Sequence, residues 1–266
     1  MKGKVVTITS GKGGVGKTTT TANLGLALAA LDQKVVCIDT DIGLRNLDVV
    51  MGLENRIVYD LVDVIENRCR LSQAMIRDRR YENLFLIPAA QTRDKSAISP
   101  SDMVKLCDQL REDMDWIIID SPAGIERGFR NALAPSDEVL LITNPEVSAV
   151  RDADRIIGLV EAEEKGPTKL IINRLNLAMV KRGDMLSAQD VVELLAIPLI
   201  GIVPDDQSVL VSTNHGLPVV LNEKSKAGQA FSNISRRLMG EDVPWMDLDE
   251  KDGFFNRLGK MVSGGN

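Results

Sequence analysis

Short apolar runs recur along the chain and alternate with stretches whose apolar residues return every three or four positions. Several runs are apolar on successive residues, as in Ile117-Ile118-Ile119, which is typical of a strand covered on both faces of its sheet. Strands are predicted over Lys4–Thr9, Lys34–Asp39, Leu84–Pro88, Trp116–Asp120, Glu138–Thr143, Lys169–Asn173 and Leu199–Val203. Helices are predicted between them, for example over Thr18–Leu31, Ser101–Asp113, Ser148–Glu164 and Ser187–Leu195. The pattern indicates an α/β fold with a doubly wound, mostly parallel sheet and helices on both faces.

One glycine-rich loop joins the first predicted strand to the first predicted helix. It matches the phosphate-binding pattern G-x-x-x-x-G-K-[ST] through Gly11, Lys12, Gly13, Gly14, Val15, Gly16, Lys17 and Thr18. The glycines let backbone N–H groups turn toward a phosphate, and the positive end of the following helix favours the same anion. Lys17 is expected to reach the β- and γ-phosphates, and the Thr18 hydroxyl to complete the shell of a Mg²⁺ ion. The loop predicts a P-loop NTPase that binds a nucleoside triphosphate with Mg²⁺.

Acidic residues follow two of the predicted strands. Asp39 and Asp41 come after the second, where they can serve phosphoryl transfer or simply cap a turn. Beside a phosphate loop we favour the first interpretation, with Asp41 positioning the attacking water and Asp39 nearer the metal. Asp120 ends the fourth predicted strand, as in a Walker B motif, and is expected to reach Mg²⁺ directly or through water. Pro122 and Gly124 follow it in a loop that can respond to the γ-phosphate.

Two later strand ends are candidates for holding the adenine. Asn173 follows an apolar run and could pair with a base edge through its amide, and Pro204 lies just after another run. Turn formation explains both residues nearly as well. His215, the one histidine in the sequence, stands between Asn214 and Gly216 and is interpreted as a surface turn residue.

Composition limits the remaining possibilities. The chain has 266 residues, 44% of them hydrophobic and 26% charged, which suits a folded α/β protein with a sizeable core. A net charge of −6 argues against a general nucleic-acid-binding surface. The three cysteines have no metal or disulfide spacing, which indicates a reduced, cytoplasmic protein. There is neither a signal peptide nor an apolar stretch long enough for a transmembrane helix, so any membrane contact is expected to be peripheral.

The charged helix and the end of the chain suggest interaction surfaces. Arg151, Asp152, Asp154 and Arg155 on the predicted Ser148–Glu164 helix form either a solvated face or a partner-docking face, and the pattern leaves both open. We expect three regions: a P-loop ATPase domain over 1–240, an acidic linker over 241–250 and an amphipathic tail over 251–266. The tail carries three basic residues and one apolar stripe, which favour the surface of an anionic membrane over packing on the body. That stripe includes Phe254, Phe255, Leu258 and Met261.

These motifs together resemble the MinD family, the septum site-determining branch of the deviant Walker A (ParA/MinD) ATPases. The resemblance runs almost end to end and is most specific in Lys12–Thr18, Asp39–Asp48, Asp120–Gly124, Arg151–Arg155 and the terminal helix. It implies that ATP clamps two subunits face to face, with Lys12 of each contacting the other's phosphates. It also implies that the dimer binds the inner face of the cell membrane, recruits the division inhibitor MinC, and hydrolyses ATP to ADP and phosphate under stimulation by MinE. Asp152 and Asp154 are expected on the partner-binding surface.

Four other classes of ATPase or kinase compete with this interpretation. A ParA-type partitioning ATPase should carry a basic surface, whereas this chain is acidic. An iron-sulfur ATPase of the nitrogenase reductase type needs cysteines near its switch loops, and none closely follows Asp120. A small-molecule kinase needs a second substrate site, and no motif for such a site can be identified in the sequence. A flagellar-number ATPase of the FlhG type also has a membrane tail, and the segment Gly43–Asp48 favours the MinD family over it.

Overall fold

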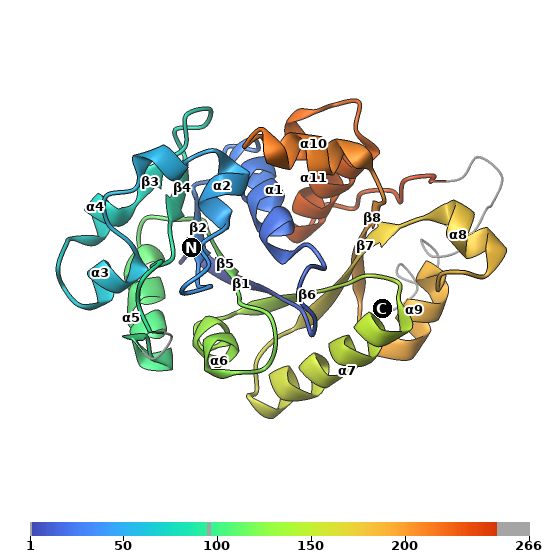
Figure 1. Ribbon diagram of the computed structural model, residues 1–266, viewed down its shortest axis with the longest axis horizontal. Helices are drawn as coiled ribbons and strands as arrows, with labels where there is room; N and C mark the ends of the chain where they lie inside the picture. Colours follow the sequence, from blue (N-terminus) through green and yellow to red (C-terminus); the bar gives the residue numbers. More distant parts are fainter. Residues whose placement is uncertain (1, 95–96, 249–266) are drawn as a thin grey trace.

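A computed structural model describes residues 2–94 and 97–248 of the chain. A single eight-stranded sheet runs through its centre in the order β3-β4-β2-β5-β1-β6-β7-β8 (Figure 1). The strands are β1 (Lys4–Thr9), β2 (Val35–Asp39), β3 (Ile76–Arg77), β4 (Leu84–Ile87), β5 (Trp116–Asp120), β6 (Glu138–Thr143), β7 (Thr168–Leu175) and β8 (Leu199–Pro204). Every neighbouring pair is parallel except β3–β4. The predicted α/β fold with a mostly parallel sheet is confirmed.

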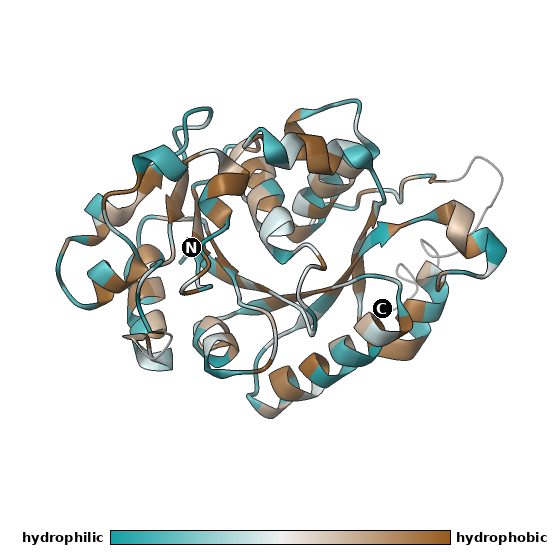
Figure 2. Cartoon of the chain, viewed as in Figure 1, coloured by the Kyte–Doolittle hydropathy of each residue, from teal (hydrophilic) through white to brown (hydrophobic). Residues whose placement is uncertain are grey.

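Helices cover both faces of the sheet because its central strands are apolar on both sides (Figure 2). One face packs against α1 (Lys17–Ala29), α2 (Leu47–Met51) and α11 (Lys226–Leu238). The opposite face packs against α3 (Leu61–Ile65), α5 (Pro100–Leu110), α6 (Arg127–Leu133), α7 (Val147–Ala162) and α9 (Ala188–Leu195). The remaining elements are α4 (Leu71–Ala74), α8 (Leu177–Arg182), α10 (Gln207–Asn214), η1 (Glu54–Arg56) and η3 (Val219–Leu221). Among the described residues, no helix is long and apolar enough to cross a membrane.

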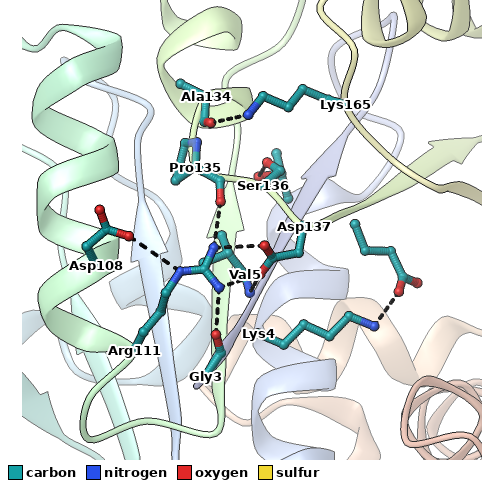
Figure 3. A network of polar contacts seen from close by, with 12 residues as sticks. Gly3, Lys4, Val5, Asp108, Arg111, Ala134, Pro135, Ser136, Asp137 and Lys165 are labelled. Carbon is teal, nitrogen blue, oxygen red and sulfur yellow. Dashed lines mark hydrogen bonds and ion pairs between the residues drawn. The ribbon is translucent and has the colours of Figure 1, made fainter. Parts of the chain in front are cut away.

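The two ends of the parallel strands form two different edges. The carboxyl edge, where β1, β2 and β5 end at Thr9, Asp39 and Asp120, faces the loop at residues 11–18. The amino edge, where β1, β5 and β6 begin, is held by Arg111 (Figure 3). The Arg111 guanidinium donates to both carboxylate oxygens of Asp137 at 2.6 and 2.9 Å and to the Gly3 carbonyl at 2.7 Å. Asp137 in turn accepts from the Val5 N–H at 2.8 Å, so one side chain pair joins the starts of two neighbouring strands.

The described part of the predicted acidic linker, residues 241–248, packs on the body of the protein. Val243 and Leu248 are buried in spite of the surrounding acidic residues. Arg237, on α11, donates to the carbonyls of Val243 and Pro244 and lies over the Trp245 ring at 4.2 Å. The apolar residues interspersed in this acidic segment explain the packing. The predicted tail, with Phe254, Phe255, Leu258 and Met261, lies outside the described residues.

Candidate functional site

The loop at residues 11–18 joins β1 to α1 at the carboxyl edge, where the sequence pattern predicted it. Gly14 and Gly16 have φ angles of 77° and 104°, in the left-handed region that favours glycine. Gly16 is also the N-cap of α1, so the loop runs directly into the helix whose positive end favours an anion. Gly11 lies against α7: a Cβ there would stand 2.3 Å from the backbone carbonyl of Asp152. Close packing therefore requires glycine at the start of the loop as well.

Lys17 lies in the first turn of α1 and is only 8% exposed. Its Nζ donates a hydrogen bond to Ser10 Oγ at 3.1 Å. Burial lowers the pKa of the Lys17 ammonium, and the negative charges of Asp120 and Asp41 oppose that lowering. An almost buried cation with little hydrogen bonding is suited to an anionic ligand. Ser10 was not predicted as a site residue; its position directly before Gly11 was the available signal.

Asp120 and Asp39 end neighbouring strands at the same level, since they are register partners on β5 and β2. Burial raises the pKa of the Asp120 carboxyl and the charge of Asp39 raises it further, while a hydrogen bond with Thr18 and the charge of Lys17 oppose this. The hydroxyl of Thr21, which sequence reasoning missed, donates to Asp120 Oδ1 at 3.3 Å. Two buried acids beside one lysine form a site that favours a bound cation, because a cation relieves their mutual repulsion.

Asp39 is occupied by the backbone of its own loop. Its carboxylate accepts from the N–H groups of Asp41 at 2.9 Å and of Asn46 and Leu47 at 3.1 Å each. Burial raises its pKa, and these three hydrogen bonds oppose the rise. The arrangement ties the start of α2 to the end of β2 and fixes the backbone of Asp41. Asp39 therefore has a structural part in the site that its predicted place near the metal did not include.

The residues present fit magnesium held mainly by a nucleotide. Among residues 2–94 and 97–248, no group of three or more His, Cys, Asp or Glu side chains could enclose a metal. Thr18 and Asp120 are nevertheless hydrogen-bonded neighbours and both offer oxygen atoms. Mg²⁺ is commonly bound by one or two protein oxygens together with phosphates and waters. Thr18 and Asp120 would hold such an ion, which supplies charge neutralisation of the phosphates.

Lys12 extends toward the first turn of α7. Its Nζ lies 3.4 Å from Glu146 Oε2 and 3.3 Å from Ser148 Oγ, and its side chain is 45% exposed. An exposed pair of this kind contributes little to stability and can be broken at small cost. The two lysines of the loop therefore differ in environment, Lys17 being buried in the site and Lys12 standing on the surface.

The two predicted adenine residues lie at the ends of the last two strands. Asn173, on β7, is buried, and its Nδ2 donates to the Val15 carbonyl at 2.7 Å. Pro204 is the last residue of β8 and is the register partner of Leu175. Asn173 thus reaches the phosphate loop itself, a contact that its sequence position did not reveal. The adenine assignment of both residues stays a prediction.

The charged helix predicted as a partner-docking face is α7. Asp152 is partly buried where α7 meets Gly11, whereas Asp154 is exposed. Asp152 Oδ1 lies 4.0 Å from the Arg155 guanidinium, a surface pair of little energetic weight. The helix α7 therefore packs against the phosphate loop at Gly11, and its role as a docking surface stays a prediction.

Comparisons with known proteins agree with this geometry. Residues 3–172 match a family described as an AAA domain. The chain is 54% identical to the septum site-determining protein MinD of Synechocystis sp. over 264 residues, covering 98% of this chain and 99% of that protein. It is similar to MinD in the MinC:MinD cell division protein complex of Aquifex aeolicus, with a TM-score of 0.86, 49% identity, and 92% and 99% of the two chains covered. It is also similar to MinD of Pyrococcus horikoshii complexed with Mg-ADP, with a TM-score of 0.79, 29% identity, and coverage of 88% and 95%.

Proposed function

The chain belongs to the MinD family of septum site-determining proteins, and from that premise we propose that it is a membrane-associating ATPase that dimerises on ATP. It hydrolyses ATP to ADP and phosphate and helps to place the division site. The observation that carries the proposal is the buried Lys17 beside Asp120. Lys17 stands at the end of a loop in which Gly14 and Gly16 have left-handed backbone conformations. This combination of one buried cation, two buried acids and a helix N-terminus that no described side chain caps is suited to the polyphosphate of Mg·ATP.

Two groups carry the hydrolysis. Lys17 neutralises charge on the β- and γ-phosphates from within the subunit. Asp41 orients the attacking water. The hydrogen bond from its N–H to Asp39 holds its backbone in place in the loop between β2 and α2. Replacing Asp41 by alanine is expected to leave ATP bound and to slow hydrolysis by orders of magnitude, measured as phosphate release. Unchanged turnover would return Asp41 to the role of a turn residue.

Lys12 joins the two subunits of the ATP-bound dimer. Among the described residues its exposed side chain contacts Glu146 and Ser148 at the start of α7. These weak surface contacts can give way to the phosphates of a second copy. Lys12→Ala is expected to keep measurable ATP binding but to lose ATP-dependent dimerisation and hydrolysis. Size-exclusion chromatography with ATP tests this, and normal dimerisation of Lys12→Ala would contradict it.

The partner surface is proposed on α7. The partly buried Asp152 is the residue of α7 that touches Gly11, and the exposed Asp154 lies two residues further along the same helix. A partner docked there would lie close to the phosphate loop. MinC is the proposed recruited inhibitor, as the similarity to the MinC:MinD complex of Aquifex aeolicus suggests. MinE is the proposed activator, and it would use an overlapping surface.

Membrane attachment is proposed to follow the nucleotide through avidity. A tail with few cations, consisting of residues 251–266 after the linker at 241–250, should bind a bilayer weakly, because one short helix must be ordered for a small apolar area. Two tails held in one dimer gain a high effective concentration at the surface, which strengthens attachment without any change in either tail. The protein would then be cytoplasmic with ADP and peripheral on the inner face of the membrane with ATP.

Co-sedimentation of the full chain with anionic liposomes tests the proposal. Binding is expected with ATP and not with ADP or without nucleotide. Phe255→Glu and a truncation before Lys251 should lose liposome binding but keep ATP-dependent dimerisation, whereas Lys12→Ala should lose both. Equal binding of the intact chain in ATP and ADP, or full binding by the truncated chain, would remove the membrane switch from the proposal.

A further inference from the structure

Strand β7 is irregular at the point where it passes the phosphate loop. Its register with β8 runs from the pair Ile172–Ile202 to the pair Leu175–Pro204, so two residues of β7 stand opposite one of β8. The second of the two, Arg174, has a φ of 55°, a left-handed conformation that costs a non-glycine residue energy. A bulge of this kind redirects the side chains beside it and is often found next to functional sites. Here the redirected residue is Asn173.

The amide of Asn173 is fixed at both of its ends. Its Nδ2 donates to the Val15 carbonyl at 2.7 Å, and its Oδ1 accepts from the Arg174 N–H at 3.0 Å. Turning the amide over would set an oxygen against the Val15 carbonyl and an NH₂ against an N–H, so the two contacts determine one orientation. Asn173 is 7% exposed, and a buried amide normally keeps hydrogen-bond partners within the protein.

The neighbouring Gly16 completes this contact. A Cβ at Gly16 would lie 2.4 Å from Asn173 Nδ2, so the absence of a side chain lets β7 and the loop approach each other. Gly16 is the N-cap of α1 and immediately precedes Lys17. A group that holds the Val15 carbonyl therefore holds the point from which Lys17 and the first turn of α1 begin.

We propose that Asn173 is a positioning residue of the ATPase, which ties the phosphate loop to β7 through the Val15 carbonyl. The inference rests on the proposed function of the loop as a polyphosphate site. In this role Asn173 acts through the loop, with or without nucleotide. It keeps the loop open before a ligand arrives, which lowers the ordering cost of binding. The role is distinct from the predicted adenine recognition, because a contact with the loop affects every ligand that uses the loop, including one without a base.

The first test uses the nucleotide-free full chain. In Asn173→Ala the N–H of Thr20, which donates to the Gly16 carbonyl at 2.9 Å, should exchange with deuterium about tenfold faster than in the intact chain, because one buried hydrogen bond that restrains the loop is lost. Asn173→Asp, which keeps the shape but removes the donor, should behave similarly. Asn176→Ala is the matched control, since the Asn176 side chain is hydrogen-bonded to Ala178 and Met179, at the start of α8, and to Asp205. Unchanged exchange at Thr20 in both Asn173 variants would overturn the proposal whether or not the protein proves to be an ATPase.

The second test separates the loop from the base. Mg·tripolyphosphate carries the phosphates of ATP without its adenine, and its affinity can be measured beside that of Mg·ATP. In Asn173→Ala the affinity for Mg·tripolyphosphate is expected to fall about tenfold and that for Mg·ATP at least as much, whereas Asn176→Ala leaves both unchanged. A fall for Mg·ATP with unchanged Mg·tripolyphosphate binding would assign Asn173 to the adenine and contradict the proposal. Failure of the intact chain to bind either ligand would instead contradict the proposed function, while the exchange test would still decide the role of Asn173.

Discussion

The two edges of the sheet differ in how their cations are hydrogen-bonded. At the amino edge, the Arg111 guanidinium donates to Asp137 and to the carbonyls of Gly3 and Pro135 (Figure 3). At the carboxyl edge, the Lys17 ammonium donates one hydrogen bond among the described residues, to Ser10. The acids differ in the same way. Burial would raise the pKa of Asp137, but its hydrogen bonds with Arg111 and Val5 lower it below the ordinary value. Burial and the charge of Asp39 raise the pKa of Asp120. At the amino edge the charged groups are paired with each other, whereas at the carboxyl edge the charged groups are placed to pair with a ligand.

Three uncharged side-chain oxygens near the carboxyl edge also lack hydrogen-bond partners within the described residues. Thr9 Oγ1, Thr20 Oγ1 and Asn144 Oδ1 are buried and accept or donate no hydrogen bond among the described residues. Thr9 ends β1, Thr20 lies in the first turn of α1 and Asn144 follows β6. Buried polar atoms without protein partners cost free energy unless water or a ligand hydrogen-bonds to them, so this edge holds groups that a ligand can satisfy. We infer that the fold places its stabilising contacts at the amino edge and its binding groups at the carboxyl edge.

Lys17→Ala should give the largest effect and separate the two edges most clearly. The loss of one buried, charge-assisted contact to phosphate is expected to weaken Mg·ATP binding by roughly a hundredfold or more. The free energy of unfolding of the nucleotide-free protein should stay the same or rise, because a desolvated cation is removed. Isothermal titration and urea unfolding measure the two quantities. Loss of stability together with binding would contradict a division between the edges.

Arg111→Ala should give the opposite result. Leaving the Asp137 carboxylate and the Gly3 and Pro135 carbonyls without their donor is expected to cost about 2 kcal/mol, a figure reduced for the partial exposure of Asp137. Affinity for Mg·ATP should not change. Arg130→Ala is the control, since the Arg130–Glu163 pair at 3.6 Å is exposed on both sides and should matter by less than about 0.5 kcal/mol. An equal loss in the two variants would show that the Arg111 contacts carry no special weight.

The dependence of stability on pH should have opposite signs at the two edges. The lowered pKa of Asp137 contributes stability above the ordinary value of 3.8, and this is lost as the pH falls through the folded-state pKa. The raised pKa of Asp120 makes the folded state hold a proton that the unfolded state has released, so stability falls as the pH rises from 3.8 toward the raised pKa.

Urea unfolding of two variants over this pH range checks those signs. At pH 7 the nucleotide-free Asp120→Asn protein should be more stable than the intact chain, with a difference that shrinks toward pH 4. Asp137→Asn should be less stable at pH 7, with a deficit that shrinks below pH 4. The effect of each is expected to be on the order of 1 kcal/mol. A pH-independent difference for either variant would show that its carboxyl does not titrate as described.

The sequence predicted the sheet better than the side-chain contacts. Seven strands could be located because a parallel strand buried on both faces is a continuous apolar run. The strand at Ile76–Arg77 was missed, since two residues at an antiparallel edge are too few to show a period. The loop was located because its backbone conformation requires glycines at fixed spacing, and that spacing is visible in the sequence. The reach of Asn173 to Val15 was not predictable, because it depends on a register shift in β7 and on the conformation of Arg174.

The most direct test of the division between the edges is the stabilisation of the folded chain by nucleotide at one temperature. Urea unfolding of the intact chain, Arg111→Ala and Lys17→Ala is measured at 25 °C with and without Mg·ADP at about a hundred times the dissociation constant of the intact chain. The intact chain and Arg111→Ala should both gain about 2.7 kcal/mol, although Arg111→Ala starts from a lower stability, and Lys17→Ala should gain almost nothing. Loss of the gain in Arg111→Ala, or its survival in Lys17→Ala, would contradict the account.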